Sequence, residues 1–192
     1  MPNRDPLPRF ADGIALRRLA AADLPAFQRY RRDPEVGRYQ GWSAMADAEA
    51  RAFLAEMSSV ALFTPGRWSQ IAIADAISLE LIGDIGLFLS ADDAQAEIGF
   101  TLCPQAQGKG RGSAAVRVAM GLVFEQTGVE RILGITDSRN APSIRLLERV
   151  GMDRSESRAG EFRGESCIEQ VYVIQRRSGR FAGNVHAARD AT

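Results

Sequence analysis

Residues 104–116 read PQAQGKGRGSAAV. Gly108, Gly110 and Gly112 alternate with Lys109 and Arg111, and a helix-like run follows at once. Glycine adopts backbone conformations closed to other residues and lets N–H groups approach a ligand closely. A helix N-terminus adds unsatisfied donors and about half a positive charge. The stretch therefore predicts an anion-binding loop at the head of a helix, suited to a diphosphate.

Three other interpretations of this loop stay open. A Walker P-loop is disfavoured because Lys109 is followed by Gly110 rather than by Ser or Thr. A dinucleotide fingerprint matches formally at Gly110, Gly112 and Ala115, but residues 103–107 separate it from the preceding strand, and the expected strands before it have no helices between them. The third is a tight turn whose charges face water, although glycines so closely spaced are costly in chain entropy.

The rest of the chain predicts an α/β protein of the α+β type, with one mixed sheet and helices packed on it. A loose leader (1–13) and a tail (177–192) are expected to flank one domain at 14–176. The strand at 96–103 and the strand at 131–136 flank a helix, so they are expected to pair in parallel through a right-handed crossover. Periodicity and turn residues predict strands at 14–18, 68–76, 79–89, 96–103, 131–136, 152–162 and 166–175, helices at 23–32, from 47, after the glycine loop and from 140, and a loop at 33–42.

Composition narrows the class of protein. The formal net charge of zero indicates no general affinity for nucleic acid or for an acidic membrane. No apolar run approaches the roughly 18 residues of a membrane span, and the first residues do not resemble a signal peptide. Cys103 and Cys167 have no metal-ligand spacing and suit a reducing, cytoplasmic setting. The lone histidine, His186, lies in the expected tail, so neither a metal site nor a histidine triad is expected.

Three motifs together resemble the GNAT superfamily of acetyl-CoA-dependent N-acetyltransferases. Residues 107–112, QGKGRG, resemble its [QR]-x-x-G-x-[GA] signature, and AEIGFTLCP (96–104) resembles its fourth strand. NAPSIRLLERVGM (140–152) is similar to a run in the branch that acetylates ribosomal-protein N-termini and in its small-molecule relatives. The resemblance covers about 14–176. It implies a GNAT fold, with a six- to seven-stranded mixed sheet, splayed fourth and fifth strands and about four helices.

The resemblance also implies an activity, which is acetyl transfer from acetyl-CoA to a primary amine by direct attack in a ternary complex. The acceptor is expected to be a protein N-terminus or a small-molecule amine, and the protein a monomer or a homodimer. The alternative is a non-catalytic sensor that binds acyl-CoA. Leu147 keeps this alternative open, because many members of the superfamily have a tyrosine at that position as the general acid.

The same resemblance assigns cofactor-binding residues. Pantetheine is expected to lie between the splayed strands as an added strand, with an N–H near Leu102 polarising the acetyl carbonyl. Asn140 is expected to touch the cofactor, although it is equally suited to cap a helix, and Ser143 is expected near the sulfur as the substitute acid. Lys109 and Arg111 either contact phosphate or face water. The implied set is Phe100, Thr101, Leu102, Gln107, Gly108, Lys109, Gly110, Arg111, Gly112, Ser113, Asn140 and Ser143.

The base and the acceptor site are less strongly indicated. Glu97, at the start of the fourth strand, is the first candidate for the base, and Asp84 and Glu165 are others. Each could equally be a solvated or salt-bridged carboxylate. The acceptor is expected to meet Tyr39, Gln40 and Trp42 on the 33–42 loop, Trp68 and Asp84, although both tryptophans could equally be partly buried structure.

Overall fold

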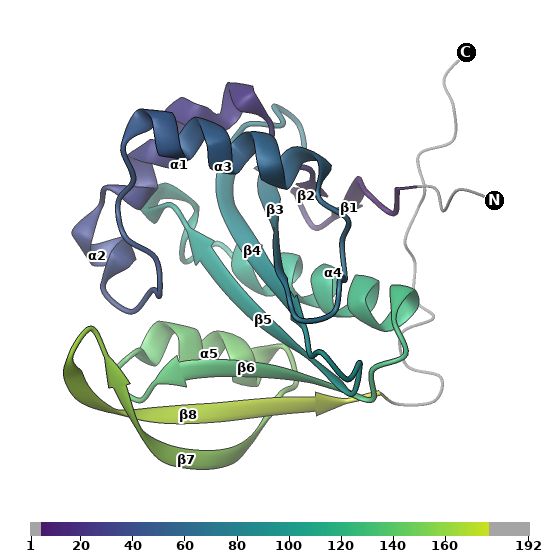
Figure 1. Ribbon diagram of the computed structural model, residues 1–192, viewed down its shortest axis with the longest axis vertical. Coiled ribbons are helices and arrows are strands. Elements are labelled where there is room, and N and C mark those ends of the chain that lie inside the picture. Colours follow the sequence, from purple (N-terminus) through teal and green to yellow (C-terminus); the bar gives the residue numbers. More distant parts are fainter. Residues whose placement is uncertain (1–4, 177–192) are drawn as a thin grey trace.

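Eight strands form one mixed sheet within residues 5–176, which are the residues that the computed structural model describes (Figure 1). The strand order is β1-β2-β3-β4-β5-β6-β8-β7. Along the chain the elements are β1 (Arg9–Ala11), β2 (Ile14–Arg17), η1 (Ala21–Asp23), α1 (Leu24–Arg31), α2 (Pro34–Gly37), α3 (Asp47–Ser59), β3 (Trp68–Asp75), β4 (Leu81–Leu89), β5 (Gln95–Leu102), η2 (Pro104–Ala106), α4 (Arg111–Gln126), β6 (Arg131–Asp137), α5 (Ala141–Arg149), β7 (Asp153–Phe162) and β8 (Glu165–Gln175).

The predicted mixed sheet is confirmed, and it has one strand more than expected. Arg9–Ala11, placed in the loose leader from the sequence, forms β1 and pairs antiparallel with β2. The turn between them consists of Asp12 and Gly13, both with positive φ (44° and 78°). Asp-Gly is a preferred two-residue hairpin turn, because its left-handed conformation matches the twist of the strands. That dipeptide was the signal for the extra strand.

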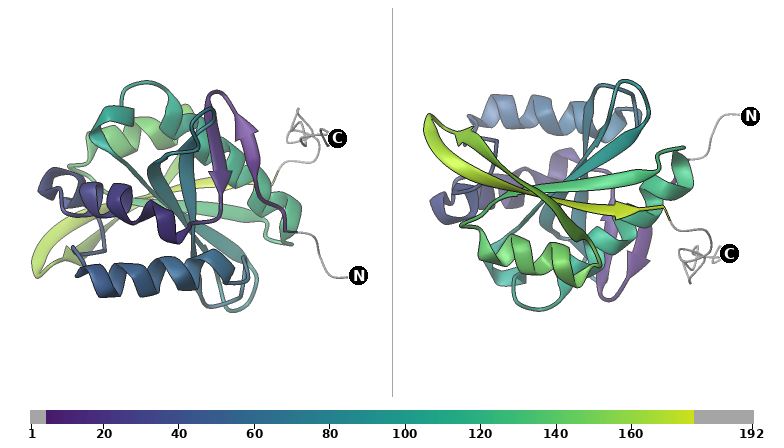
Figure 2. Two further views of the ribbon diagram at one scale, coloured as in Figure 1. Left: turned by 90° about the horizontal axis from the view of Figure 1, so that it is seen from above. Right: turned by 90° about the horizontal axis from the view of Figure 1, so that it is seen from below.

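Helices cover both faces of the sheet, and each face has its own apolar core (Figure 2). On one face α4 packs against β2 and β5, and α5 packs against β6 and β7. On the other face α1 and α3 pack against β4 and β3. The expected 33–42 loop also contains the short helix α2, because Asp33 caps it through hydrogen bonds from the Glu35 and Val36 amides. No helix within 5–176 is long and apolar enough to cross a membrane.

The feature that positions the site is the divergence of β5 from β6. They pair in parallel only from Gln95 to Glu97 and from Arg131 to Leu133. Beyond Glu97, β5 continues beside β4 as far as Leu102, whereas β6 continues beside β8 as far as Asp137. A wedge therefore opens between the two halves of the sheet, as Figure 1 shows. The predicted splay of these strands is confirmed.

Candidate active site

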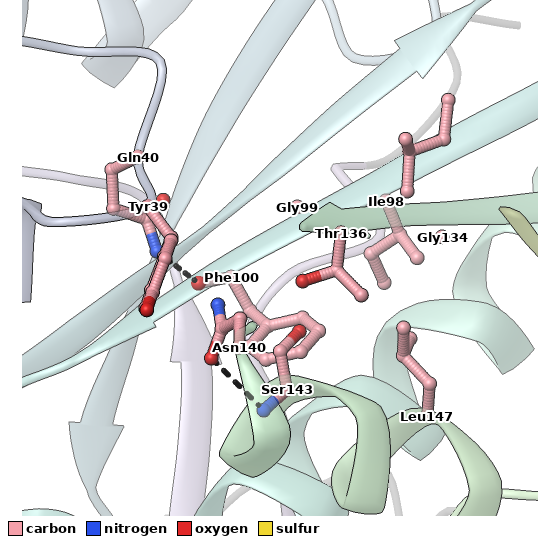
Figure 3. Close-up of a pocket in the computed structure, with 11 residues that line it drawn as sticks. Tyr39, Gln40, Ile98, Gly99, Phe100, Gly134, Thr136, Asn140, Ser143 and Leu147 are labelled. Atoms are coloured by element: carbon pink, nitrogen blue, oxygen red, sulfur yellow. Dashed lines mark hydrogen bonds between the residues drawn. The ribbon is translucent and has the colours of Figure 1, made fainter. Parts of the chain in front are cut away.

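A pocket lies in the wedge between β5 and β6 (Figure 3). Ile98, Gly99 and Phe100 line it from β5, and Gly134, Ile135 and Thr136 from β6, all just beyond the last paired residues. The 33–42 segment and α5 supply its remaining lining: Tyr39, Gln40, Asn140, Ser143 and Leu147. Of these lining residues, Ile98 and Gly99 on β5 and all three on β6 were missed from the sequence. Their only signal was their place after Glu97 and Leu133, where pairing between β5 and β6 ends.

The glycine loop turns directly into the head of α4, as the sequence predicts. Gly108 and Gly110 have φ of 72° and 77°, in the left-handed region, and Gly110 is the N-cap of α4. Gly112 is needed for a different reason, since a Cβ there would lie 2.8 Å from Leu146 Cδ1 and 2.9 Å from Leu102 Cδ1. The glycines therefore turn the loop and bring the head of α4 close against β5 and α5.

Three side chains at this loop differ in how accessible they are to an anion. Arg111 is not a free cation, because its Nη2 lies 2.8 Å from Asp75 Oδ2 in a half-buried ion pair. Lys109 is exposed. Ser113 is buried in the first turn of α4, and its Oγ has no hydrogen-bond partner among the described residues. The first-turn amides of α4, which have no partner within the helix, are therefore the donors best placed for a phosphate.

The backbone of β5 offers alternate residues to the wedge. The Phe100 carbonyl accepts from Gln40 Nε2 at 3.3 Å and the Leu102 carbonyl from Gln107 Nε2 at 3.0 Å. Cys103 N–H instead donates to Ile82 O, and Thr101 is paired with Asp84, so their backbone groups face β4. Because these directions alternate along a strand, the wedge-facing groups belong to Phe100 and Leu102. The structure does not place Thr101 with them.

The start of α5 brings two predicted residues, Asn140 and Ser143, to the pocket. Asn140 both lines the pocket and caps α5, with Oδ1 accepting from the Ser143 amide at 3.3 Å. The side chain of Ser143 lies one turn further on, also in the lining. Leu147 is buried, and its Cδ2 would lie 2.7 Å from a Cβ on Gly134. An apolar, closely packed side chain thus occupies the position where, as noted above, many members of the superfamily that the sequence resembles have a tyrosine.

Glu97 stands at the vertex of the wedge, as the last residue of β5 paired with β6. Its side chain is on the face opposite to that of Ile98 and Phe100, since side chains alternate along a strand. Burial raises the pKa of its carboxyl, the nearby Arg158 guanidinium opposes that shift, and Glu169 adds to it. Arg158 itself is paired with Glu169 at 2.8 Å. Glu97 is therefore a half-buried carboxylate whose affinity for a proton is raised.

Two predicted acceptor residues lie outside the pocket. Asp84 is 1% exposed and accepts from Tyr30, Arg31 and Gln70 beneath α1, so an acceptor cannot reach it. Trp42 packs against the Arg31 guanidinium, 4.3 Å from its ring centroid, and does not line the pocket. Asp84 pairs with the buried Arg31 guanidinium, and Trp42 packs against the same group. Neither contact can be predicted from the local sequence pattern. The Trp68 ring lies tilted against that of Phe88, and Trp68 is 47% exposed.

The 33–42 segment is tied to the wedge from two sides. Gln40 donates to the Phe100 carbonyl, as described above, and Arg163 Nη2 donates to the backbone carbonyls of Trp42 at 2.7 Å and Gln40 at 3.3 Å. Arg163 lies in the turn between β7 and β8, where it and Gly164 both have positive φ. The sequence suggested a turn here and gave no sign of this contact, which joins residues 121 positions apart. Glu165 is exposed at the same turn.

The chain is similar in sequence to known proteins. Residues 14–153 match the model of the acetyltransferase (GNAT) domain family. The chain is 24% identical over 176 residues to an uncharacterized N-acetyltransferase, p20, of Bacillus licheniformis, covering 91% of this chain and 98% of that one. It is 28% identical over 144 residues to an uncharacterized N-acetyltransferase, YoaA, of Bacillus subtilis, covering 74% and 81%.

Solved structures share the fold. An acetyltransferase of the GNAT family from Bacillus anthracis has a TM-score of 0.76 at 21% identity, covering 88% of this chain and 98% of that one. A Salmonella typhimurium acetyltransferase that modifies the N-terminal serine of a 50S ribosomal subunit protein has a TM-score of 0.73 at 16% identity, covering 87% and 97%. Spermidine N-acetyltransferase from Vibrio cholerae, in complex with CoA and spermine, has a TM-score of 0.70 at 18% identity, covering 85% and 95%.

Proposed function

Because the chain belongs to the GNAT acetyltransferase family, we propose that residues 14–176 move an acetyl group from acetyl-CoA to a primary amine by direct attack in a ternary complex. The chain is an acyltransferase by family, and acetyl-CoA is the family's acetyl donor. The acceptor and the chemical roles of individual residues form the proposal. Within 5–176 there is no group of three or more His, Cys, Asp or Glu that could hold a metal, and the proposed chemistry uses none.

The observation that carries the proposal is the wedge between β5 and β6, with the head of α4 beside its rim. Gly112 of α4 lies against Leu102 of β5, so a molecule anchored at the head of α4 can continue directly along β5. A diphosphate suits the α4 amides. The amide groups of an extended arm suit the backbone groups of Phe100 and Leu102. This arrangement supports an acyl-CoA as the ligand, and we expect its sulfur to lie near Asn140 and Ser143.

The residues of the chain supply positioning first and proton transfer second. A wedge-facing N–H of β5, near Leu102, is positioned to stabilise the oxygen that becomes negative as the amine attacks. Glu97 is proposed as the base, acting through a water, because a carboxyl whose pKa is raised accepts a proton better near neutral pH. An α-amine, with a pKa of about 7.7–8.0, needs less help than a lysine amine at about 10.4.

Two acceptor classes remain within this proposal. A protein N-terminus is supported by the fold shared with the Salmonella enzyme, and a small polyamine by the fold shared with the Vibrio enzyme. Because the 33–42 segment and the β7–β8 turn border the wedge, both classes would enter between them. The competing function is an acyl-CoA sensor without turnover, and the packing of Leu147 where many relatives have an acid is the observation that favours it.

Thiol release measured on the purified full chain tests the function. We expect release of free CoA that depends on both acetyl-CoA and an amine, in a panel that contains N-terminal peptides, polyamines and lysine peptides. Calorimetry should show binding of acetyl-CoA and none of NAD. Binding of acetyl-CoA without release for any amine would favour the sensor, and preferential binding of NAD would refute the acetyltransferase altogether.

A further inference from the structure

Hydroxyl groups line the pocket from three sides. Thr136 comes from β6, Ser143 from α5 and Tyr39 from the 33–42 segment. Figure 3 shows the Tyr39 ring descending from its loop with the hydroxyl end toward α5. A phenol, with a pKa of about 10, is a much stronger acid than the aliphatic hydroxyl of serine. Since Leu147 cannot donate a proton, Tyr39 is the strongest uncharged acid in the lining.

The Tyr39 hydroxyl is free to act. It makes no hydrogen bond to any other residue in 5–176, and its side chain is half-buried. Its two companions on the segment are held, since Gln40 bonds to the Phe100 carbonyl and Trp42 is packed against Arg31. Arg163 fixes the backbone on both sides of Gly41. A side chain on a segment anchored at several points is preorganised, which is what a proton donor needs.

Charged side chains lie around Tyr39. The Arg38 guanidinium carbon lies 5.4 Å from the centroid of the Tyr39 ring. Arg139, at the start of the turn into α5, is close enough for its charge to interact with the Tyr39 hydroxyl. Asp137 neutralises part of that charge through its 2.7 Å ion pair with Arg139, and Glu165 also acts on Arg139. The surroundings of Tyr39 therefore contain charges of both signs.

We propose that Tyr39, rather than Ser143, is the catalytic acid that protonates the departing thiolate. The inference rests on the proposed acetyl transfer. In that step the amine nitrogen forms a bond to the acetyl carbon and the carbon–sulfur bond breaks. The electron pair of that bond stays on sulfur, which takes the proton of the Tyr39 hydroxyl. The amine releases one proton to water or Glu97, and the Tyr39 phenolate regains one from solvent, so protons balance over the cycle.

The test compares Tyr39→Phe with Ser143→Ala and with Tyr172→Phe in full-length protein. Tyr172 is a matched control, because its hydroxyl bonds to Glu148 and does not line the pocket. Acetyl-CoA affinity, measured by calorimetry, confirms that each variant retains its fold and its cofactor site. Thiol release is then followed over roughly pH 6–10. The acceptor is an amine that the wild type acetylates, at a saturating concentration.

We expect Tyr39→Phe to lower kcat by about 10²-fold, the usual size of a general-acid contribution, with little change in KM for the acceptor. A fluorinated tyrosine of lower pKa, introduced at position 39 alone, should shift the alkaline fall in kcat to lower pH. Tyr172→Phe should keep most of the turnover, and Ser143→Ala should lower kcat less than Tyr39→Phe does.

Other outcomes overturn the inference. A rise in KM for the acceptor with kcat unchanged would make Tyr39 a binding residue only. A large loss in Ser143→Ala with none in Tyr39→Phe would return the acid role to Ser143. A wild-type chain that binds acetyl-CoA and releases no thiol would instead refute the proposed function itself, and the inference with it.

Discussion

Arg31 donates to the Asp84 carboxylate at 2.9 Å, and each of the two side chains is only 1% exposed. The guanidinium is also flanked by the rings of Phe27 at 4.8 Å and Trp42 at 4.3 Å. This buried ion pair connects the sheet to α1 and to the segment that carries Tyr39. It therefore contributes to the stability of the fold and also holds the pocket-lining segment in place.

Asp84→Ala should destabilise the protein by about 3–5 kcal/mol, because it leaves the Arg31 charge buried without a partner. Urea unfolding followed by circular dichroism measures the loss. Glu56→Ala is the control, since its pair with Arg67 is exposed at both ends and surface pairs contribute little. Replacing both partners, as Arg31→Met with Asp84→Leu, should recover much of the loss. If Asp84→Ala were as stable as the wild type, the Arg31–Asp84 pair could not be closed off from water.

Gly110→Asp should abolish binding of acetyl-CoA in calorimetry, because it places a negative charge and a side chain at the N-cap of α4 where phosphate is proposed to bind. Gly151→Asp is a matched control, with a φ of 89° and open space for a Cβ, at the far end of α5. Both variants carry similar backbone strain, about 1–3 kcal/mol. Equal affinity in the two variants would remove the glycine loop from the binding site.

Glu97→Gln tests the base and its pKa together. If the carboxylate accepts a proton, turnover by the wild type falls as pH falls through the raised pKa of Glu97, and Glu97→Gln loses both the activity and this acidic limb. For stability the sign is opposite to that of a salt-bridged carboxylate. A folded-state pKa above the unfolded value means that the ionised form is disfavoured by folding at neutral pH.

Glu97→Gln should therefore be at least as stable as the wild type at about pH 7–8, because this range lies well above the ordinary Glu pKa of about 4.3. The difference should shrink as pH falls below the raised pKa. Thermal unfolding over a pH series shows this. A variant less stable at neutral pH would indicate that Glu97 is held by a favourable ion pair instead.

Arg163→Ala should loosen the 33–42 segment while leaving global stability nearly unchanged, because the contact is exposed and joins only two backbone carbonyls. Hydrogen exchange should become faster for amides near Gly41 and stay the same in α4. Arg163→Lys keeps the charge without the planar fork of donors and should be intermediate. Unchanged exchange at 38–43 in Arg163→Ala would show that Gln40 and Trp42 hold the segment without it.

The sequence was sufficient wherever a local pattern determined the structure. Strand alternation located β3, β4 and β5, and the alternating glycines located the head of α4. Asn140 also behaves as its local sequence indicates, as a helix cap that faces the pocket. The family resemblance, rather than any pattern in the residues, supplied the expectation that β5 and β6 diverge.

Contacts between distant segments could not be read in this way. The pairing of Asp84 with Arg31 depends on how α1 lies across β4, and a single strand pattern shows only that Asp84 occupies a particular face. Arg111 carries a positive charge that would suit a phosphate, yet it forms an ion pair with Asp75 on β3. The contact of Arg163 with Trp42 depends on the bend of a whole hairpin. Each of these is a tertiary choice among several partners of suitable charge.

The short seam between β5 and β6 has a mechanical consequence. Their three parallel pairs are the whole ladder that joins one half of the sheet to the other, whereas β4 and β5 are zipped along seven. Ladder hydrogen bonds resist bending, so this seam resists rotation of the two halves less than the β4–β5 ladder resists its own. A rotation at Glu97 would change the width of the wedge without breaking the pairs within either half.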